Sequence, residues 1–341
     1  MNSLDRVRCS MRGQAVDYPP NFSILIAPAC QLTGTPQGRY SQDAHVMADT
    51  LLAARDLTQA DGIYVSRDNW VYHQALGGEL VFPDDDEPYA PRAVLASLED
   101  FRRLALGEPE HAPGMKTLLA AAREVVALAG DRYYIQANID CGPFSVAAVL
   151  RGVQNFMMDV ATGDGALLAE FLEFCTEAVI AYGRAMIATG VHGIQYGDSV
   201  ASLIGPDMYR QYALPYQHKS LSALAGRGCD LWLHICGQTE HILPQVARLP
   251  IDGFEVDALV DIALARRLLG ERIALKGNLP TTFLLRETPA AVYAATREII
   301  RRHGRTSGLV VSAGCGVPRA TPLDNLLAMA RACRDSGPGA R

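Results

Sequence analysis

The fold of this chain is constrained most by a repeated alternation of short apolar runs with amphipathic helical stretches. The runs that we predict as strands are 22–27, 62–65, 133–138, 193–196, 230–234, 253–256, 272–275 and 308–312. Helices are predicted near 42–59, 97–105, 115–129, 146–151, 165–189, 206–226, 239–248, 261–269, 289–303 and 322–334. Strands that alternate with helices are typical of parallel βα units. About eight such units in 341 residues favour an α/β fold of the (β/α)8 TIM-barrel class.

A doubly wound open sheet is the alternative, but no Gly-x-Gly-x-x-Gly motif opens the first helix. We find no linker, low-complexity segment or internal repeat, so we expect one domain over residues 1–341. Within it, residues 1–20 form an N-terminal extension and residues 21–335 form the barrel. A predicted hairpin at 76–82, closed by the acidic turn at 84–86, adds to this helical and hairpin extension.

The composition indicates a soluble globular protein, with 49% hydrophobic and 20% charged residues. The net charge is −6, and no run of Lys and Arg exceeds two residues, which argues against nucleic acid or an anionic membrane as a partner. The first residues lack the pattern of a signal peptide, and no apolar run approaches the roughly 20 residues of a membrane helix. We therefore expect a cytoplasmic protein.

Polar residues gather where the predicted strands end. In a TIM barrel the catalytic groups lie at the C-terminal ends of the strands. The polar residues at these ends are Asn138, Asp140, Tyr196, Asp198, His234, Cys236, Glu255, Asp257, Lys276, Asn278, Ser312 and Cys315.

Three of these residues suggest a metal site. His234 and Cys236 follow an apolar strand two positions apart, and alternate residues of a strand point to the same side. Cys315 follows the last predicted strand between two glycines, which allow a tight turn. Three protein ligands with an open fourth position are typical of catalytic zinc, and imidazole with two thiolates suits zinc better than magnesium or calcium.

The competing interpretation makes Cys236 and Cys315 ordinary buried thiols and His234 a hydrogen-bonded core residue. Eight cysteines are scattered over the chain, and in a reducing compartment they do not indicate a disulfide framework. Most of them are expected to be small buried apolar residues. Cys141, at another strand end, is a candidate pocket-lining thiol.

An ordered set of segments is similar to one known family. These are 142–148 (GPFSVAA), 197–202 (GDSVAS), 234–237 (HICG), 276–278 (KGN), 314–318 (GCGVP) and 321–325 (TPLDN), with further likeness at 4–20 and 75–83. Over nearly its whole length the chain resembles the uroporphyrinogen decarboxylase superfamily. Within it, the chain resembles the zinc-dependent branch that includes methylcobamide:coenzyme M methyltransferases and corrinoid-linked demethylases.

Two departures favour the methyltransferase branch. The decarboxylases carry an arginine-rich loop that grips the carboxylates of the tetrapyrrole, whereas the corresponding residues 27–34 (APACQLTG) contain no arginine. Where the decarboxylases have a histidine near the C-terminus, this chain has Cys315.

The resemblance implies zinc on His234, Cys236 and Cys315, and methyl transfer between a cobalt corrinoid and a small thiol, methoxy or methylamine-type substrate. A zinc-bound thiolate would attack the methyl group of methyl-Co(III), and Co(I) would leave. In the demethylating direction, Co(I) would attack the methyl group instead. Asp198 is then expected to be a catalytic residue in the pocket. The residues expected to bind substrate are Tyr196, Asn278, Asn138 and Cys141.

The corrinoid itself is expected to come from outside this chain. Residues 43–48 (DAHVMA) come close to the Asp-x-His-x-x-Gly motif of corrinoid modules, but they lack the glycine. We therefore expect cobalamin, free or on a separate corrinoid protein, that is not held covalently. The alternatives are a decarboxylase-like lyase acting on a tetrapyrrole and a non-catalytic corrinoid- or metal-binding protein. The sequence leaves open the methyl donor or acceptor, the direction of transfer, the fourth zinc ligand and the oligomeric state.

Overall fold

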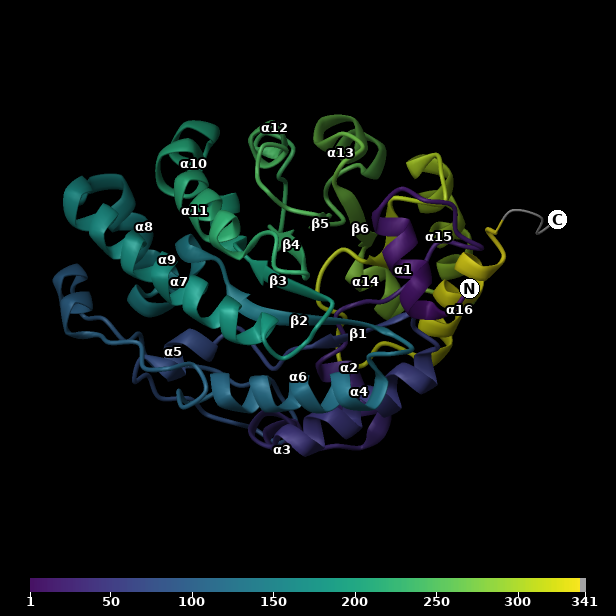
Figure 1. The fold of residues 1–341 in the computed structure, drawn as a ribbon, viewed down its shortest axis with the longest axis horizontal. Helices are drawn as coiled ribbons and strands as arrows, with labels where there is room; N and C mark the ends of the chain where they lie inside the picture. Colours follow the sequence, from purple (N-terminus) through teal and green to yellow (C-terminus); the bar gives the residue numbers. More distant parts are fainter. Residues whose placement is uncertain (338–341) are drawn as a thin grey trace.

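The centre of the molecule is a curled, seven-stranded parallel sheet with its strands in sequence order (Figure 1). The computed structural model describes residues 1–337. Its strands are β1 (Gly62–Val65), β2 (Tyr134–Cys141), β3 (Gly193–Gly197), β4 (Asp230–His234), β5 (Gly253–Glu255), β6 (Ala274–Leu279) and β7 (Leu309–Ala313). Each strand pairs in parallel with the next. The predicted α/β architecture of the TIM-barrel class is confirmed.

The eighth strand position is occupied by a single bridge. The predicted strand at 22–27 is wrong, because only Asn21 pairs with Val311 of β7. The amide of Val311 donates to the carbonyl of Pro20 (2.8 Å), and the amide of Asp61, just before β1, donates to the carbonyl of Asn21 (2.7 Å). The chain therefore joins β7 to β1 and then leaves the ring. Its apolar residues are used differently, since Phe22 is buried in the core and Ile24 lines a pocket.

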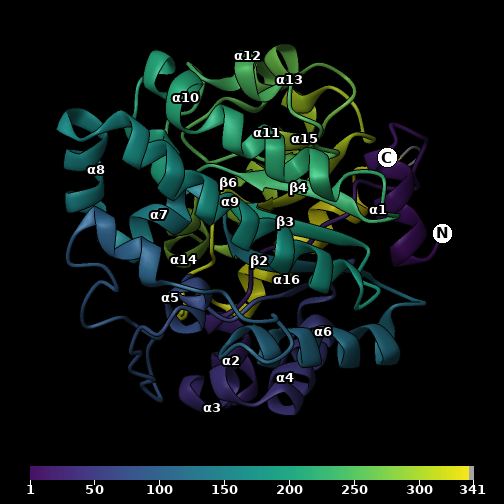
Figure 2. The same ribbon diagram turned by 60° about the vertical axis from the view of Figure 1, so that its left-hand side comes forward.

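Helices surround the sheet. They are α1 (Ser3–Met11), α2 (Ala27–Thr33), α3 (Gln37–Gln42), α4 (Ala44–Thr58), α5 (Val71–Ala75), α6 (Met115–Ala129), α7 (Pro143–Arg151), α8 (Val153–Thr162), α9 (Gly165–Ile187), α10 (Pro206–Tyr212), α11 (Leu214–Leu224), α12 (Leu243–Val246), α13 (Ile262–Leu269), α14 (Thr281–Arg286), α15 (Pro289–His303) and α16 (Leu323–Arg334). Two short 3-10 helices, η1 (Leu98–Arg103) and η2 (Ser199–Leu203), complete the set. Figure 2 shows α2, α3 and α4 together beside α6.

One predicted helix is divided at a proline. The helix expected at 206–226 is two helices, α10 and α11, because Pro215 at the start of α11 has no amide hydrogen to continue the first helix. The predicted hairpin at 76–82 is reduced to one antiparallel bridge between Val81 and Tyr89.

In the described range 1–337, no helix is both long enough and apolar enough to cross a lipid bilayer.

The barrel interior contains a buried ion pair. We expected Glu255 and Lys276 at the mouth, but β6 continues past the predicted end at 275 to Leu279, so Lys276 lies within the strand and inside the ring. Its ammonium group donates to Glu255 (3.0 Å) and to the side chain of Gln136 (2.7 Å). The rings of Phe22 and Tyr64 lie 4.2 and 5.0 Å from the same nitrogen. These contacts compensate a buried charge that would otherwise be costly.

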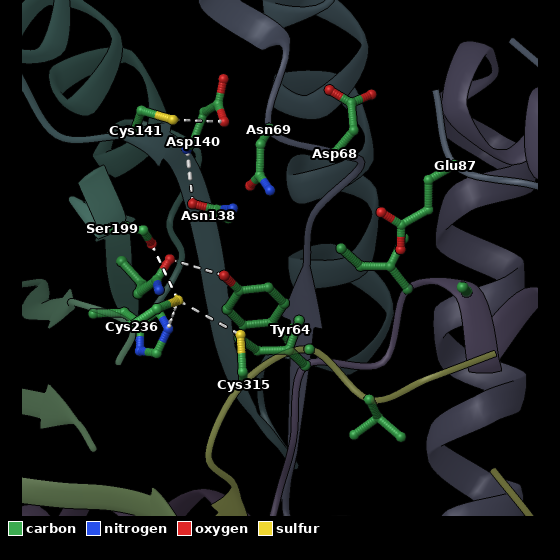
Figure 3. A pocket seen from close by; sticks show the side chains of 18 of the residues that line it. Tyr64, Asp68, Asn69, Glu87, Asn138, Asp140, Cys141, Ser199, Cys236 and Cys315 are labelled. Atoms are coloured by element: carbon green, nitrogen blue, oxygen red, sulfur yellow. Dashed lines mark hydrogen bonds between the residues drawn. The ribbon is translucent and has the colours of Figure 1, made fainter. Parts of the chain in front are cut away.

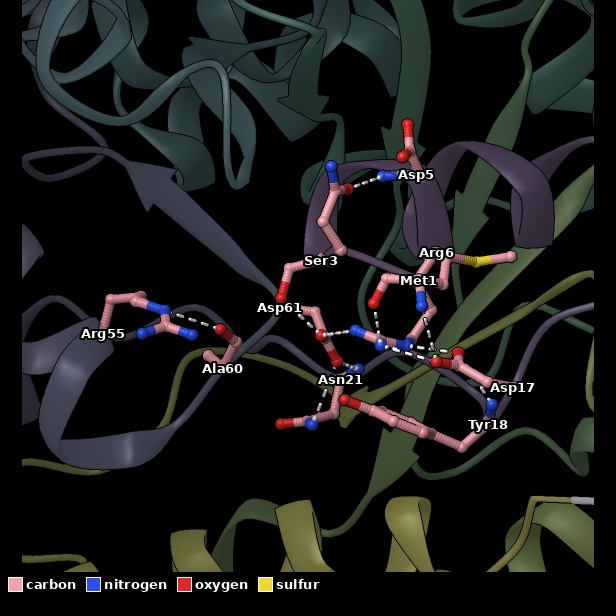
Figure 4. Close-up of polar contacts among 11 residues, drawn as sticks. Met1, Ser3, Asp5, Arg6, Asp17, Tyr18, Asn21, Arg55, Ala60 and Asp61 are labelled. Atoms are coloured by element: carbon pink, nitrogen blue, oxygen red, sulfur yellow. Dashed lines mark hydrogen bonds and ion pairs between the residues drawn. The ribbon is translucent and has the colours of Figure 1, made fainter.

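Helix α1 closes the N-terminal end of the barrel, where the strands begin (Figure 4). Arg6 of α1 contacts Asp61 through Nη1 (2.6 Å) and Asp17 through Nε (2.7 Å), and its guanidinium lies 3.8 Å from the ring of Tyr18. Asp61 also accepts hydrogen bonds from Ser3 (2.9 Å) and from the amide of Asn21 (3.0 Å). The extension therefore joins α1 to the bridge that closes the ring.

Candidate metal centre and pocket

The structure brings together the three predicted metal ligands at the C-terminal ends of the strands. His234 is the last residue of β4, Cys236 follows it, and Cys315 lies in the loop after β7. The imidazole Nε2 is 2.9 Å from the sulfur of Cys236, and the two cysteine sulfurs are 3.7 Å apart. The three ligand atoms all lie within 4.8 Å of one another.

Backbone groups orient this triad. The Nδ1 of His234 is 3.1 Å from the carbonyl oxygen of Glu255, which is its register partner on β5. An Nδ1–H that donates to this carbonyl leaves the lone pair of Nε2 directed toward the thiols. Gly314 lets the loop after β7 pass close to the loop after β5, because a Cβ at this position would lie 2.4 Å from the amide nitrogen of Ala258. Glycine is therefore required next to Cys315.

The two thiols differ in their surroundings. The thiol of Cys315 faces Cys236, and the hydroxyl of Ser199 lies 3.2 Å from the same sulfur of Cys236. Donation from Cys315 lowers the pKa of Cys236, although burial opposes it, and Ser199 adds to the effect. The hydrogen bond to Cys236, with burial, raises the pKa of Cys315.

The donor set fits a zinc ion. Two thiolates on one tetrahedral zinc, each at about 2.3 Å, lie about 3.8 Å apart. The observed separation of the two sulfurs is 3.7 Å. One nitrogen and two sulfur donors at a partly open position match the ligand set of catalytic rather than structural zinc.

The triad forms one end of a cavity of about 600 Å³ (Figure 3). Apolar side chains from the loop after Asn21, from α7 and from the loop after β7 line its sides, and they include Ile24, Ile26, Val149 and Val317. Tyr64 of β1 lies beside the triad and donates to Gln195 in the barrel interior (2.8 Å). The cavity is large enough for a small organic substrate.

Two of the predicted substrate-binding residues line this cavity. Asn138 accepts a hydrogen bond from the amide of Asp140 (2.7 Å) and donates to Ser66 (3.2 Å). The sulfur of Cys141 lies 3.4 Å from a carboxylate oxygen of Asp140. Burial raises the pKa of Cys141, so this thiol is neutral.

The structure does not bring the other three predicted site residues to the described cavity wall. Asp198 is 0% exposed, and its carboxylate accepts from the amide of Ser145 and from Gln217, both at 2.7 Å. Tyr196 points toward α11, with its hydroxyl 3.4 Å from Ser220. Asn278 donates to the carbonyls of two residues in the loop after β5, Asp257 and Val260.

Asp140 is the main residue of the cavity that we named among the polar residues at the strand ends but did not assign to the site. Its φ is +68°, a conformation that is uncommon for a residue other than glycine. Its Oδ2 accepts from the amides of Val71 (2.8 Å) and Tyr72 (3.3 Å). Burial, together with the charge of Asp68, raises the pKa of Asp140 to about 7. An Asp at the end of a fully buried strand was the available signal.

Comparison with known proteins places this geometry in context. The family model described as uroporphyrinogen decarboxylase (URO-D) matches residues 2–336. A methylated-thiol–coenzyme M methyltransferase of Methanosarcina mazei is 27% identical over 342 residues, which cover 98% of this chain and 90% of that protein. The methylcobamide:CoM methyltransferase MtaA of Methanosarcina barkeri is 32% identical over 345 residues, 96% of each chain. A solved methyltransferase from Methanosarcina mazei superposes with a TM-score of 0.88 at 26% identity, over 98% of both chains.

Proposed function

This chain belongs to the uroporphyrinogen decarboxylase (URO-D) family, and we propose that it is a methyltransferase that moves a methyl group between a cobalt corrinoid and a small thiol. The observation that carries the proposal is the convergence of His234, Cys236 and Cys315 at one end of the cavity. Relatives named as methylcobamide:CoM methyltransferases support the same reaction class.

The three ligands would hold zinc, and they would leave one position open toward the cavity. A zinc ion bound there would supply Lewis acidity that keeps a substrate thiol deprotonated near neutral pH. The carbonyl of Glu255 orients the imidazole of His234, and the hydroxyl of Ser199 orients the thiol of Cys236. Apolar side chains such as Ile26 and Val200 exclude water from the reacting sulfur.

In the thiol-methylating direction, the substrate sulfur attacks the methyl carbon of the methyl-corrinoid. A sulfur–carbon bond forms and the cobalt–carbon bond breaks, with its electron pair remaining on cobalt, which passes from Co(III) to Co(I). The thiol proton is released to solvent when the thiolate forms. The reverse direction begins with Co(I) and a methylated substrate.

Asp198 acts in this proposal as a positioning residue. Its amide donates to the carbonyl of His234 (2.8 Å), and its carboxylate fixes Ser145 and Gln217. Ser199, which contacts Cys236, is the next residue of the chain. A rigid Asp198 therefore holds the start of η2 against the metal ligands.

We further propose that the corrinoid arrives on a separate protein or as free cobalamin. The near-motif at 43–48 has another use, because the Asp43 side chain caps α4 by accepting from the amides of His45 and Val46. His45 itself is exposed on the surface of α4 and is hydrogen-bonded to Glu124. Neither residue lines the described cavity.

A tetrapyrrole substrate is disfavoured by the same cavity. Helix α2, which corresponds to the arginine-rich loop of the decarboxylases, contains no arginine. The cavity wall instead carries Asp68, Glu87 and Asp140. A substrate with eight carboxylates would meet like charges there.

The experiment combines metal analysis with turnover. Wild-type protein and Cys315→Ser are assayed for bound zinc, for loss of methylcobalamin and for the S-methylated product, with a panel of small thiols. We expect about one zinc per wild-type chain and a methylated thiol, and neither for the variant. Equal zinc in both proteins, or carbon dioxide release from uroporphyrinogen without thiol methylation, would contradict the proposal.

A further inference from the structure

The cavity has two chemically different ends (Figure 3). One end holds the sulfur and imidazole groups of the triad. The other end carries carboxylates from three separate segments, namely Asp68 after β1, Glu87 in the loop near the Val81–Tyr89 bridge, and Asp140 at the end of β2. A substrate whose sulfur lies at the triad shares one cavity with these carboxylates.

Two of these carboxylates are buried and fixed. Asp140 is 2% exposed and Asp68 is 4% exposed, yet both line the cavity. Asp140 is held by the amides of Val71 and Tyr72 on one oxygen, and its own amide is held by Asn138. It therefore cannot turn away from an incoming charge.

The nearby cations offset only part of this negative charge. Arg67 pairs with Asp68 through Nε and Oδ2 (2.5 Å), donates to Gln74 and lies under the ring of Phe82. It is buried and does not contribute to the described cavity wall, so it neutralises Asp68 and cannot reach a substrate.

Arg319 is the arginine that does line the cavity, and it is already engaged. It donates to Gln37 (2.8 Å), and its charge acts on Glu87. Partial burial raises the pKa of Glu87, the charges of Asp68 and Asp86 add to this, and Arg319 opposes it. Arg67 offsets the charge of Asp68, and Arg319 offsets that of Glu87. The carboxylates of Asp86 and Asp140 remain without a compensating cation among the described residues, and both line the cavity.

We propose that this acidic end selects a small substrate whose remote group is uncharged or cationic, and that it discriminates against a sulfonate or carboxylate. The inference rests on the proposed function for the reacting sulfur. A hydroxyl or ammonium group can donate a hydrogen bond to the Asp140 carboxylate. A sulfonate has no proton to donate and adds a buried like charge, which is destabilising where water is excluded.

The test uses three thiols with the same two-carbon spacing: 2-mercaptoethanesulfonate, 2-mercaptoethanol and 2-aminoethanethiol. Methylcobalamin is the methyl donor, and kcat/KM is measured for each thiol with the zinc-loaded full chain at pH 8.5, where Asp140, with its pKa of about 7, is ionised. We expect the neutral and cationic thiols to exceed the sulfonate at least tenfold. A sulfonate that is used as well as or better than the other two overturns the inference.

Variants locate the effect on the acidic end. Asp140→Asn removes the charge with little change in shape, and we expect it to reduce the discrimination against the sulfonate about fivefold. The matched control is Asp85→Asn, on an exposed turn outside the described cavity wall, which should leave the ratio unchanged. Glu87→Gln, in an exposed loop, gives a second reading if Asp140→Asn folds poorly. Equal ratios in wild type and both cavity variants contradict the inference.

Calorimetric titration of the same thiols separates this inference from the proposed function. Binding in the order amine and alcohol before sulfonate, without methylated product, supports the selection and rejects methyl transfer to thiols. Methylation with the sulfonate preferred supports methyl transfer and rejects the selection. Absence of binding by all three thiols rejects the selection as well.

Discussion

The two ends of the barrel both carry buried polar groups, but at the C-terminal end these groups face a cavity. At the N-terminal end, Arg6 meets Asp61 and Asp17, and Asp61 also accepts from Ser3 and Asn21. At the C-terminal end, the thiols of Cys236 and Cys315 and the carboxylate of Asp140 line a cavity. The comparison shows that buried polar groups stabilise the fold where they contact one another. Where they line a cavity, they are available to bind a ligand.

A second group at the N-terminal end makes the same point. The guanidinium of Arg266 donates to the carbonyls of Gly270, Ile273 and Gly308 and to Nε2 of His303. All of these acceptors lie in or near the segments that lead into β6 and β7. Arg266 thus ties together the segments before β6 and β7, and each nitrogen of its guanidinium makes a hydrogen bond.

The largest expected effect is a loss of turnover, without loss of stability, when a residue of the triad is replaced. Cys315→Ala should lower turnover at least a thousandfold, about 4 kcal/mol, because it removes one of the three proposed zinc ligands. The unfolding temperature of the metal-free protein should change little, since the side chain lines a cavity. Zinc content, turnover and thermal unfolding check this, with Cys9→Ala on α1 as the control. Full zinc in Cys315→Ala, or equal loss in the control, would break the comparison.

The next effect concerns the N-terminal end, where a substitution should lower stability and leave turnover unchanged. Arg6→Met should reduce the free energy of unfolding by about 3 kcal/mol, because it leaves Asp61 buried without its charge partner. The folded fraction should keep its zinc and its turnover per molecule. Denaturant unfolding with zinc analysis measures both, and Arg12→Met, on the exposed end of α1, is the control. Loss of zinc from folded Arg6→Met would show that the two ends are coupled.

The third prediction concerns pH and again concerns the N-terminal end. Burial, helped by the charges of Arg266 and Arg305, lowers the pKa of His303 to about 4. The ordinary value of 6.5 applies to the unfolded chain, so between these values the unfolded state binds the extra proton. The free energy of unfolding is therefore highest above pH 6.5 and decreases as the pH falls toward 4. The decrease due to His303 is about 2 kcal/mol between pH 7 and pH 5.

Replacement of this histidine isolates its share of the pH effect. His303→Gln should lower stability at pH 7 and remove about 2 kcal/mol of the difference between pH 7 and pH 5. Denaturant unfolding at both pH values measures the difference. His111→Gln, on an exposed loop, serves as the control. An unchanged pH dependence in His303→Gln would contradict the assignment.

The smallest effect tests the support of the metal ligands. Ser199→Ala removes the hydroxyl next to Cys236, and we expect zinc affinity to fall about tenfold, the lower end of the range for residues that orient metal ligands. Competition with a zinc chelator measures the affinity. Ser202→Ala, a neighbour in η2 whose hydroxyl bonds to the backbone of Ser199, is the matched control. A larger loss in the control than in Ser199→Ala would assign the effect to η2 as a whole.

Local patterns in the sequence were sufficient to predict much of the fold. Strand β4 and helices α6 and α15 have the predicted bounds, because each is set by its own periodicity and by flanking turn residues. The run at 22–27 was wrong as a strand, since its apolar residues fill the core and the cavity instead. Barrel closure depends on contacts between distant segments, which periodicity does not report.

The candidate site divides in the same way. Spacing and strand ends were enough to select His234, Cys236 and Cys315, which the structure brings together. The depth and direction of side chains were harder to predict, because they depend on where each strand ends and on local irregularities. Lys276 lies inside the ring because β6 continues to Leu279, and Asp140 reaches the cavity through a positive φ and a register shift in β2.

The hydrogen bond that orients His234 ends on a main-chain oxygen, and this has an evolutionary consequence. Every amino acid at position 255 supplies the same carbonyl, so drift at that position can alter the barrel interior while the imidazole keeps its orientation. The tautomer of His234 therefore depends on the pairing of β4 with β5 and not on the identity of one side chain. Insertions or deletions in β4 or β5, more than substitutions, are the changes that would erase it.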